Sequence, residues 1–91
     1  MTLTYTQHTL DKLEHLLKSL EYKVRYEKGN FKTGACLLEN HKVIVVNKFS
    51  NLESKINSLV DMLQQLDINE PLLDEKQRGF LHLLKQTTLK L

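Results

Sequence analysis

The sequence contains little cysteine, proline or glycine, and each shortage excludes something. Cys36 is the one cysteine among 91 residues, so it has no partner for an internal disulfide, which favours a reducing compartment. One proline and three glycines argue against long disordered linkers. No apolar run is longer than Val43 to Val46, which is far too short to cross a bilayer. Because residues 1–6 also lack the features of a signal peptide, we expect a cytoplasmic protein without a membrane partner.

Motifs for catalysis, metal binding and nucleotide binding are also missing from the sequence. It has no HExxH or CxxC, and its glycines match no phosphate-binding fingerprint. Cys36 lies in an apolar stretch, where a free cysteine is usually part of the core. His8, Asp11 and His15 share one helix face, but two helical turns separate the histidines by about 10.5 Å, too far for one ion. We interpret this face as solvated, and we predict no catalytic, cofactor or metal site and no enzyme.

What is present is typical of one small globular domain spanning residues 1–91. The 41% hydrophobic and 26% charged residues are close to average usage, and a chain of this length buries roughly 60–65% of its unfolded surface. The net charge of +2 is unevenly distributed. Residues 21–48 carry six bases and three acids, whereas residues 49–91 carry five bases and six acids. The middle of the chain is therefore its basic part.

The first third of the chain changes its hydrophobic period from helical to strand-like. Leucines at 10, 13, 17 and 20, with Leu16 beside them, predict an amphipathic helix over residues 6–20 that Thr6 or Thr9 caps. Residues 22–27 then alternate between Tyr or Val and charged residues, which is typical of a half-buried strand. Gly29-Asn30 predicts the turn that follows.

A β-hairpin is predicted at the centre of the chain. Its strands are Thr33 to Glu39 and Lys42 to Asn47, with a turn at Asn40-His41 or a somewhat longer loop. A two-residue turn pairs Glu39 with Lys42, Leu38 with Val43, Leu37 with Ile44 and Cys36 with Val45. Both faces of the hairpin are then apolar. We therefore expect either helices on both faces, or helices on one face and a partner subunit on the other.

Two more helices are predicted in the last part of the chain. Ser50 and Glu53 have the spacing of a capping box at the start of a helix that continues to Leu66. Asp67 to Pro71 interrupts the pattern. A third helix begins near Leu72 or at Asp74, where Asp74 and Gln77 form another capping box. Its predicted apolar residues are Leu73, Phe80, Leu81, Leu83, Leu84 and Leu91.

These elements predict an α+β fold in the order α-β-β-β-α-α. Because sequential antiparallel strands usually pair with each other, we expect a three-stranded antiparallel meander packed with helices.

Two functional hypotheses remain open at the level of the sequence. The first is an interaction or regulatory domain that acts through protein–protein contacts as a homodimer, because the hairpin is apolar on both faces. The second is binding of RNA or single-stranded DNA by the basic aromatic segment 22–32. In either case the contacts would come from Lys23, Arg25, Lys28, Phe31 and Lys32. The alternative interpretation of this segment is structural, with aromatic side chains packed inward and solvated charges on an edge strand.

Overall fold

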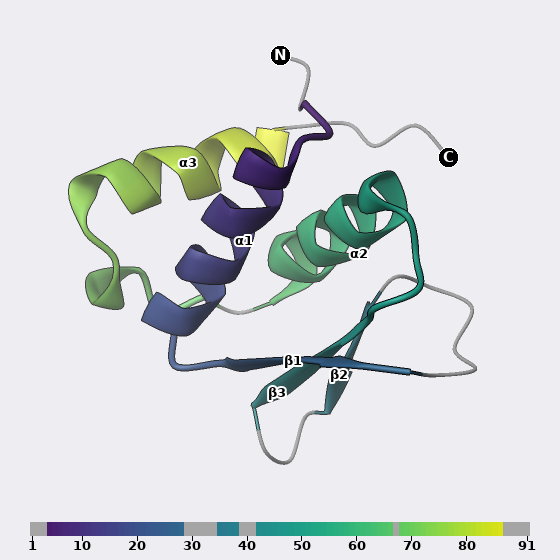
Figure 1. Cartoon of the computed structure of the whole chain (residues 1–91). Helices are drawn as coiled ribbons and strands as arrows, with labels where there is room; N and C mark the ends of the chain where they lie inside the picture. The colour runs from purple at the N-terminus through teal and green to yellow at the C-terminus, as the bar shows by residue number, and fades with distance from the viewer. Residues whose placement is uncertain (1–3, 29–34, 39–41, 67, 87–91) are drawn as a thin grey trace.

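The computed structural model describes residues 4–28, 35–38, 42–66 and 68–86, and for residues 35–38 it defines the backbone alone. Helices and strands combine in one mixed α+β arrangement, shown in Figure 1. In chain order the elements are α1 (Gln7–Ser19), β1 (Lys23–Glu27), β2 (Ala35–Leu38), β3 (Val43–Asn47), α2 (Leu52–Gln65), the short 3-10 helix η2 (Glu70–Leu72) and α3 (Glu75–Gln86).

The strand order corrects the predicted topology. The sheet has the order β1-β3-β2, with β3 parallel to β1 and antiparallel to β2. The expected three-stranded antiparallel meander is therefore wrong. The physical reason is that residues 43–46 are apolar without alternation and are all buried, which suits a central strand. β1 alternates between charged and apolar residues, which suits an edge strand.

The observed register of the hairpin confirms three predicted pairs: Cys36 with Val45, Leu37 with Ile44 and Leu38 with Val43. The same register also pairs Ala35 with Val46. The predicted turn at Asn40-His41 and the predicted pairing of Glu39 with Lys42 include residues outside the described part of the chain.

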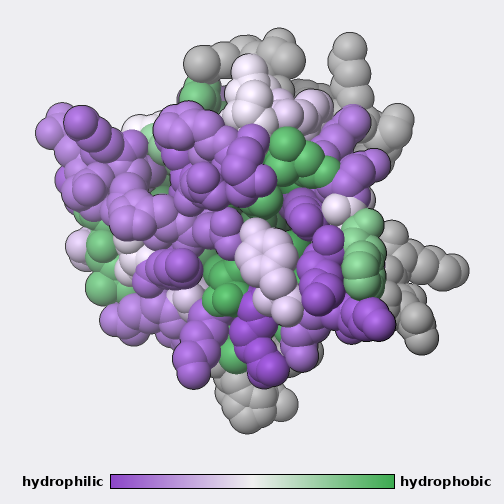
Figure 2. Space-filling model, in the orientation of Figure 1, coloured by the Kyte–Doolittle hydropathy of each residue, from purple (hydrophilic) through white to green (hydrophobic). Residues whose placement is uncertain are grey.

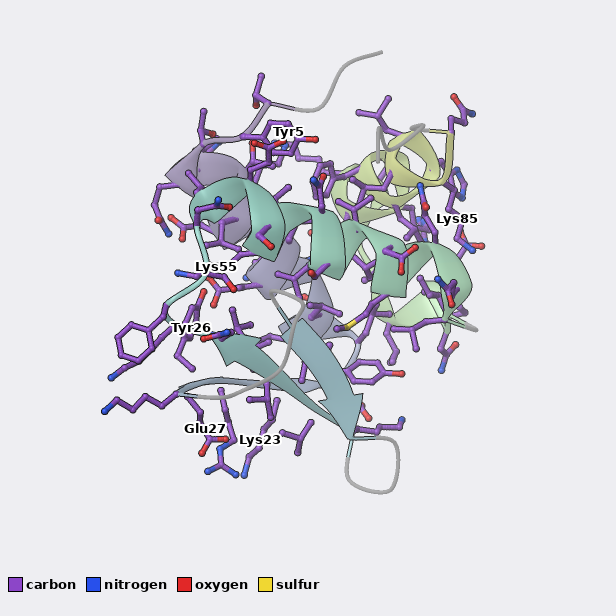
Figure 3. The ribbon with its side chains drawn as sticks, turned by 90° about the vertical axis from the view of Figure 1, so that its right-hand side faces the viewer. Tyr5, Lys23, Tyr26, Glu27, Lys55 and Lys85 are labelled. Carbon is purple, nitrogen blue, oxygen red and sulfur yellow. The ribbon has the colours of Figure 1, made fainter. Side chains whose placement is uncertain are left out.

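All three helices lie on the same side of the sheet (Figure 1). Ile44 and Val46 face them, and both are fully buried in the hydrophobic core. Val43 and Val45 alternate with these residues, so they belong to the opposite face, which we call the helix-free face. Figure 3 shows Lys23 and Glu27 extending from this face, away from the helices. The sequence predicted helices on both faces of the hairpin, or helices on one face and a partner subunit on the other. The described helices cover one face (Figure 1), and the partner subunit stays a prediction.

The leucine stripes of the helices form the core, as their spacing predicts. Leu73, which precedes α3, is buried, whereas Phe80 is only partly buried, and Leu91 lies outside the described residues. The buried cluster consists of Leu10, Leu13, Leu16, Leu17, Leu20, Ile44, Val46, Ile56, Leu59, Val60, Leu63, Leu73, Leu81 and Leu84.

Two of the three predicted helix starts are confirmed. The Thr6 hydroxyl accepts a hydrogen bond from the Thr9 amide at 3.2 Å, at the start of α1. Asp74 and Gln77 form the complete capping box before α3, with each side chain accepting from the other residue's backbone amide. The predicted capping box of Ser50 with Glu53 is wrong. Asn51 caps α2 instead, because its side chain accepts from the Ser54 amide at 2.8 Å.

The turn from α1 into β1 contains a strained residue. Glu21 has a φ of 70°, in the left-handed region that favours glycine. The Glu21 amide donates to the Lys18 carbonyl, and the Tyr22 amide donates to the Leu17 carbonyl. These two bonds are those of a Schellman motif. The motif ends α1 and directs the chain into the sheet at the cost of left-handed backbone at a residue with a side chain.

The surface shown in Figure 2 is mostly hydrophilic, with hydrophobic residues in small separate patches. Within the described ranges, no helix combines the length and the apolar character needed to cross a membrane.

Candidate functional site

The predicted contact residues within β1, Lys23 and Arg25, lie on one face of the sheet, opposite the tyrosines of the same segment. Lys23 and Arg25 are exposed on the helix-free face, where the Arg25 guanidinium lies 3.3 Å from the Glu27 carboxylate. Tyr22 and Tyr26 alternate with these residues along the chain and therefore belong to the helix-covered face. Two further predicted contacts, Phe31 and Lys32, lie outside the described residues. Within β1 itself, the basic side chains of Lys23 and Arg25 therefore lie on the face opposite the aromatic ring of Tyr26.

The parallel pairing of β1 with β3 creates a different juxtaposition. The last residues of the two strands, Glu27 and Asn47, are register partners. The chain that leaves each strand therefore begins at the same end of the sheet. The Lys48 amide donates to the Glu27 carbonyl at 3.1 Å, which continues the pairing by one step. Lys28, Lys48 and Phe49 are consequently close together although some twenty positions of sequence separate them.

Phe49 is the most exposed large hydrophobic residue described, with 66% of its surface accessible. The Lys48 ammonium lies 5.6 Å from the centre of its ring, and the Lys28 ammonium lies 5.9 Å from it. Both distances are within the range of cation–π attraction. The backbone at Phe49 is held at the end of β3, because the Phe49 amide donates to the Asn47 side chain at 3.1 Å.

Tyr26 adds a second accessible ring at this end of the sheet. It is 41% exposed, and the Lys55 ammonium of α2 lies 5.6 Å from its ring centre. Figure 3 shows Tyr26 and Lys55 on the same side of the molecule. Partial burial raises the pKa of the Tyr26 hydroxyl far above its ordinary value, and the hydrogen bond and negative charge of Glu14, with the charge of Asp11, raise it further. Tyr26 is therefore an uncharged phenol at physiological pH.

Together these side chains form what we call the aromatic–lysine cluster, which consists of Tyr26, Lys28, Lys48, Phe49 and Lys55. None of its three lysines takes part in an ion pair with another described residue. Their charges are therefore available to an external anion. Flat rings beside unpaired ammonium groups suit a ligand that offers both π faces and negative charge.

The histidines and the cysteine considered in the sequence occupy other places. His8, Asp11 and His15 are exposed on α1, which confirms the solvated polar face. No group of three or more potential ligands within the described ranges is arranged to hold a metal ion. His82 is exposed, as expected, and its Nε2 lies 2.8 Å from the Glu70 carboxylate. The backbone of Cys36 lies in β2, while its side chain and His41 are outside the described residues.

Sequence reasoning missed Lys48, Phe49 and Lys55. Each follows β3 in the sequence, and no local pattern connects them to the basic segment that begins at Tyr22. The unbroken apolar run of residues 43–46 was the available signal, because a strand that is apolar on both faces belongs at the centre of a sheet. Placing β3 beside β1 in parallel would have brought the ends of the two strands together.

Comparison of the chain with protein-family models, with curated proteins and with solved structures found no match in any of the three.

Proposed function

We propose that this protein binds single-stranded nucleic acid through the aromatic–lysine cluster. The observation that carries the proposal is Phe49, an exposed ring flanked by two lysine ammonium groups. Proteins that bind single strands without strong sequence preference stack bases on aromatic rings and track the phosphates with basic side chains. Tyr26 with Lys55 offers a second pairing of the same kind at the same end of the sheet.

A single strand fits this geometry better than a duplex. Stacking on Phe49 or Tyr26 requires an exposed base face, which a base within a double helix does not offer. The cluster lies on a strand end, a turn and the first part of α2. None of these projects as a helix that could enter a major groove.

The three lysines set the expected dependence on salt. Contacts with three phosphates of a single strand predict a slope of about −2 in a plot of log affinity against log salt concentration. A fluorescein-labelled oligothymidylate and an oligouridylate, titrated with the full chain at several salt concentrations, would give this slope by fluorescence anisotropy. Absence of binding at low salt would refute the proposal.

Variants separate stacking from general charge attraction. Phe49→Ala should weaken binding at least about five-fold, because stacking of one base is worth roughly 1–3 kcal/mol. The double variant Lys28→Ala, Lys48→Ala should make the salt slope shallower by about 1.4. The matched control removes two exposed lysines outside the cluster, Lys18 and Lys85, and changes the net charge equally. Figure 3 shows Lys85 far from Tyr26. Equal weakening by the control would indicate charge attraction without a defined site.

Homodimer formation through the helix-free face is a second candidate. It is favoured by the placement of all three helices on the other side of the sheet (Figure 1). Val43 and Val45 are only 9% and 7% exposed, so these two described residues offer little apolar area to a partner, and the candidate ranks second. Sedimentation equilibrium at micromolar concentration would decide, because a species of 10.7 kDa alone would exclude the dimer.

The proposed activity is binding without a chemical step, in the cytoplasm. The cytoplasmic assignment rests on the single cysteine, since proteins of oxidising compartments usually pair their cysteines. Fractionation of cells that express the tagged chain would test it.

A further inference from the structure

A pocket of about 360 Å³ lies between α1 and α3, and it shares no residue with the aromatic–lysine cluster. Sites for small organic ligands usually measure roughly 300–1,000 Å³. Five of the residues that line it come from α1 and three from α3. They are His8, Asp11, Lys12, His15, Leu16, Lys76, Gln77 and Phe80.

The apolar part of the lining comes from one buried and one partly buried side chain. Leu16 belongs to the core, and Phe80 packs against that core while part of its surface stays accessible. Phe80 was predicted to belong to the buried stripe of its helix, and its position at a pocket accounts for its incomplete burial. A flat apolar body fits against these two residues better than a polar one.

Gln77 fixes the relative position of the two helices at the pocket. Its amide nitrogen donates to the Ser19 hydroxyl of α1 at 2.7 Å, and its carbonyl oxygen accepts from the Asp74 amide at 3.2 Å. Both ends of this side chain are therefore engaged within the protein. The pocket is consequently preformed, which lowers the entropic cost of binding.

The charges around the pocket favour an anion. Lys12 and Lys76 supply two positive charges, one from each helix, and neither forms an ion pair with another described residue. Asp11 supplies the one carboxylate of the lining, and one of its oxygens already accepts a hydrogen bond from Gln7 at 2.9 Å. The Lys12 ammonium lies over the Phe80 ring at 4.3 Å, so a cation is held directly beside the apolar surface.

We infer that this pocket binds a small organic anion with a flat apolar body, such as an aromatic carboxylate. The body packs against Leu16 and the part of Phe80 that the Lys12 ammonium leaves uncovered, and the carboxylate accepts hydrogen bonds from the ammonium groups of Lys12 and Lys76. Such charge-assisted bonds are stronger than bonds between neutral groups. The site does not depend on nucleic-acid binding, because the two sets of residues are separate.

The test is a titration of the ¹⁵N-labelled full chain with 1-naphthoate, followed by amide chemical shifts. The largest shifts should fall within residues 8–16 of α1 and 76–80 of α3. Two matched probes define the ligand class. The neutral 1-naphthalenemethanol should bind several-fold more weakly because it lacks the charge, and inorganic phosphate should bind more weakly because it lacks the ring. Equal binding of either probe would overturn the assigned ligand class.

Variants then locate the site. Lys12→Ala with Lys76→Ala should weaken naphthoate binding by roughly ten-fold, since both charge-assisted contacts are removed. Phe80→Leu should weaken it less, because leucine keeps the apolar volume and removes the flat ring. Lys18→Ala with Lys85→Ala is the charge-matched control and should bind as the unmodified chain does. If Phe80→Leu does not fold, the comparison of the Lys12, Lys76 variant with the Lys18, Lys85 control still tests the location of the site. The inference is overturned by shifts centred elsewhere, by no shifts up to about 5 mM naphthoate, or by equal losses in both lysine pairs.

Discussion

The two faces of β3 differ in how the described helices cover them, although side chains of the same five-residue strand alternate between the two faces. Ile44 and Val46 have no accessible surface and pack beneath the helices. Val43 and Val45 are nearly as buried, yet they lie on the helix-free face and outside the core cluster. Their register partners on β1 are Lys23 and Arg25. The aliphatic stems of lysine and arginine can cover apolar surface while their charges remain in water.

This difference suggests a hypothesis that burial has two physical origins in one small sheet. On the helix-covered face, apolar side chains pack against other apolar side chains, so each lost methyl group leaves a cavity. On the helix-free face, the β1 partners of Val43 and Val45 are Lys23 and Arg25, whose long flexible side chains can rearrange over a smaller neighbour. Similar exposed fractions therefore do not imply similar contributions to stability.

Truncating matched valines on the two faces tests this difference and should give the largest effect. We expect Val46→Ala to lower the free energy of unfolding by about 2–3 kcal/mol, because it removes core contacts and leaves a cavity. Val45→Ala should cost about 1 kcal/mol, because flexible side chains can close over it. Urea denaturation of both variants gives the comparison. Equal losses would mean that the helix-free face is packed as tightly as the core.

The start of α2 determines how that helix covers the sheet, and its cap gives the next largest effect. Asn51→Ala should lower the free energy of unfolding by about 1 kcal/mol, since the hydrogen bond to the Ser54 amide is lost. Ser50→Ala is the control, and it should change stability by less than about 0.5 kcal/mol, as is usual for substitutions away from such features. A larger loss at Ser50 than at Asn51 would restore the capping box expected from the sequence.

The strained turn between α1 and β1 connects the helical layer to the edge of the sheet. Glu21→Gly should raise the free energy of unfolding by about 0.5–1 kcal/mol, because relief of left-handed strain exceeds the added freedom of the unfolded chain. Glu21→Ala keeps the strain and should leave stability almost unchanged. A gain for alanine equal to that for glycine would show that the side chain, and not the backbone, is unfavourable there.

Tyr26 lies at the open end of the helix-covered face and should give the smallest effect, visible only at alkaline pH. Its pKa is raised in the folded state above the ordinary value of 10.0, first by burial and then by Glu14. The folded chain therefore retains a proton that the unfolded chain loses. This contribution to stability is complete below pH 10 and is lost as the pH rises toward the folded-state pKa.

Tyr26→Phe should remove this alkaline loss and leave a flatter stability profile above pH 10. The measurement is urea denaturation of both proteins across the alkaline range, with the ultraviolet absorbance of tyrosinate recorded in parallel. Identical profiles for the two proteins would contradict the raised pKa.

Much of the fold followed from local patterns, and the topology did not. The leucine spacing of α1 and the capping box at Asp74 specify helices because they depend on residues three or four positions apart. The hairpin register followed from a short connection, which fixes which residues face each other. The position of β1 depends on pairing with a strand some twenty residues away. The order of strands along the chain favoured pairing each strand with the next one in sequence. The apolar character of β3 on both faces favoured a central position for it.

The candidate site was predictable only in part, for the same reason. The basic character of β1 was visible, and Lys28 remains in the aromatic–lysine cluster. Lys23 and Arg25 belong to the opposite face, because side chains alternate along a strand. Phe49 and Lys55 join the cluster through the parallel pairing of two strand ends and the position of α2. No spacing within the sequence encodes that contact.

The sequence by itself determined the three amphipathic helices, two of their caps and the register of the hairpin, since short-range geometry governs each of them. The tertiary structure alone decided the strand order, the face on which the helices pack, the exposed ring of Phe49 between two lysines, and the pocket between α1 and α3. These features join segments that are distant in the chain. They depend on how buried surface is shared among all elements at once, which no local pattern specifies.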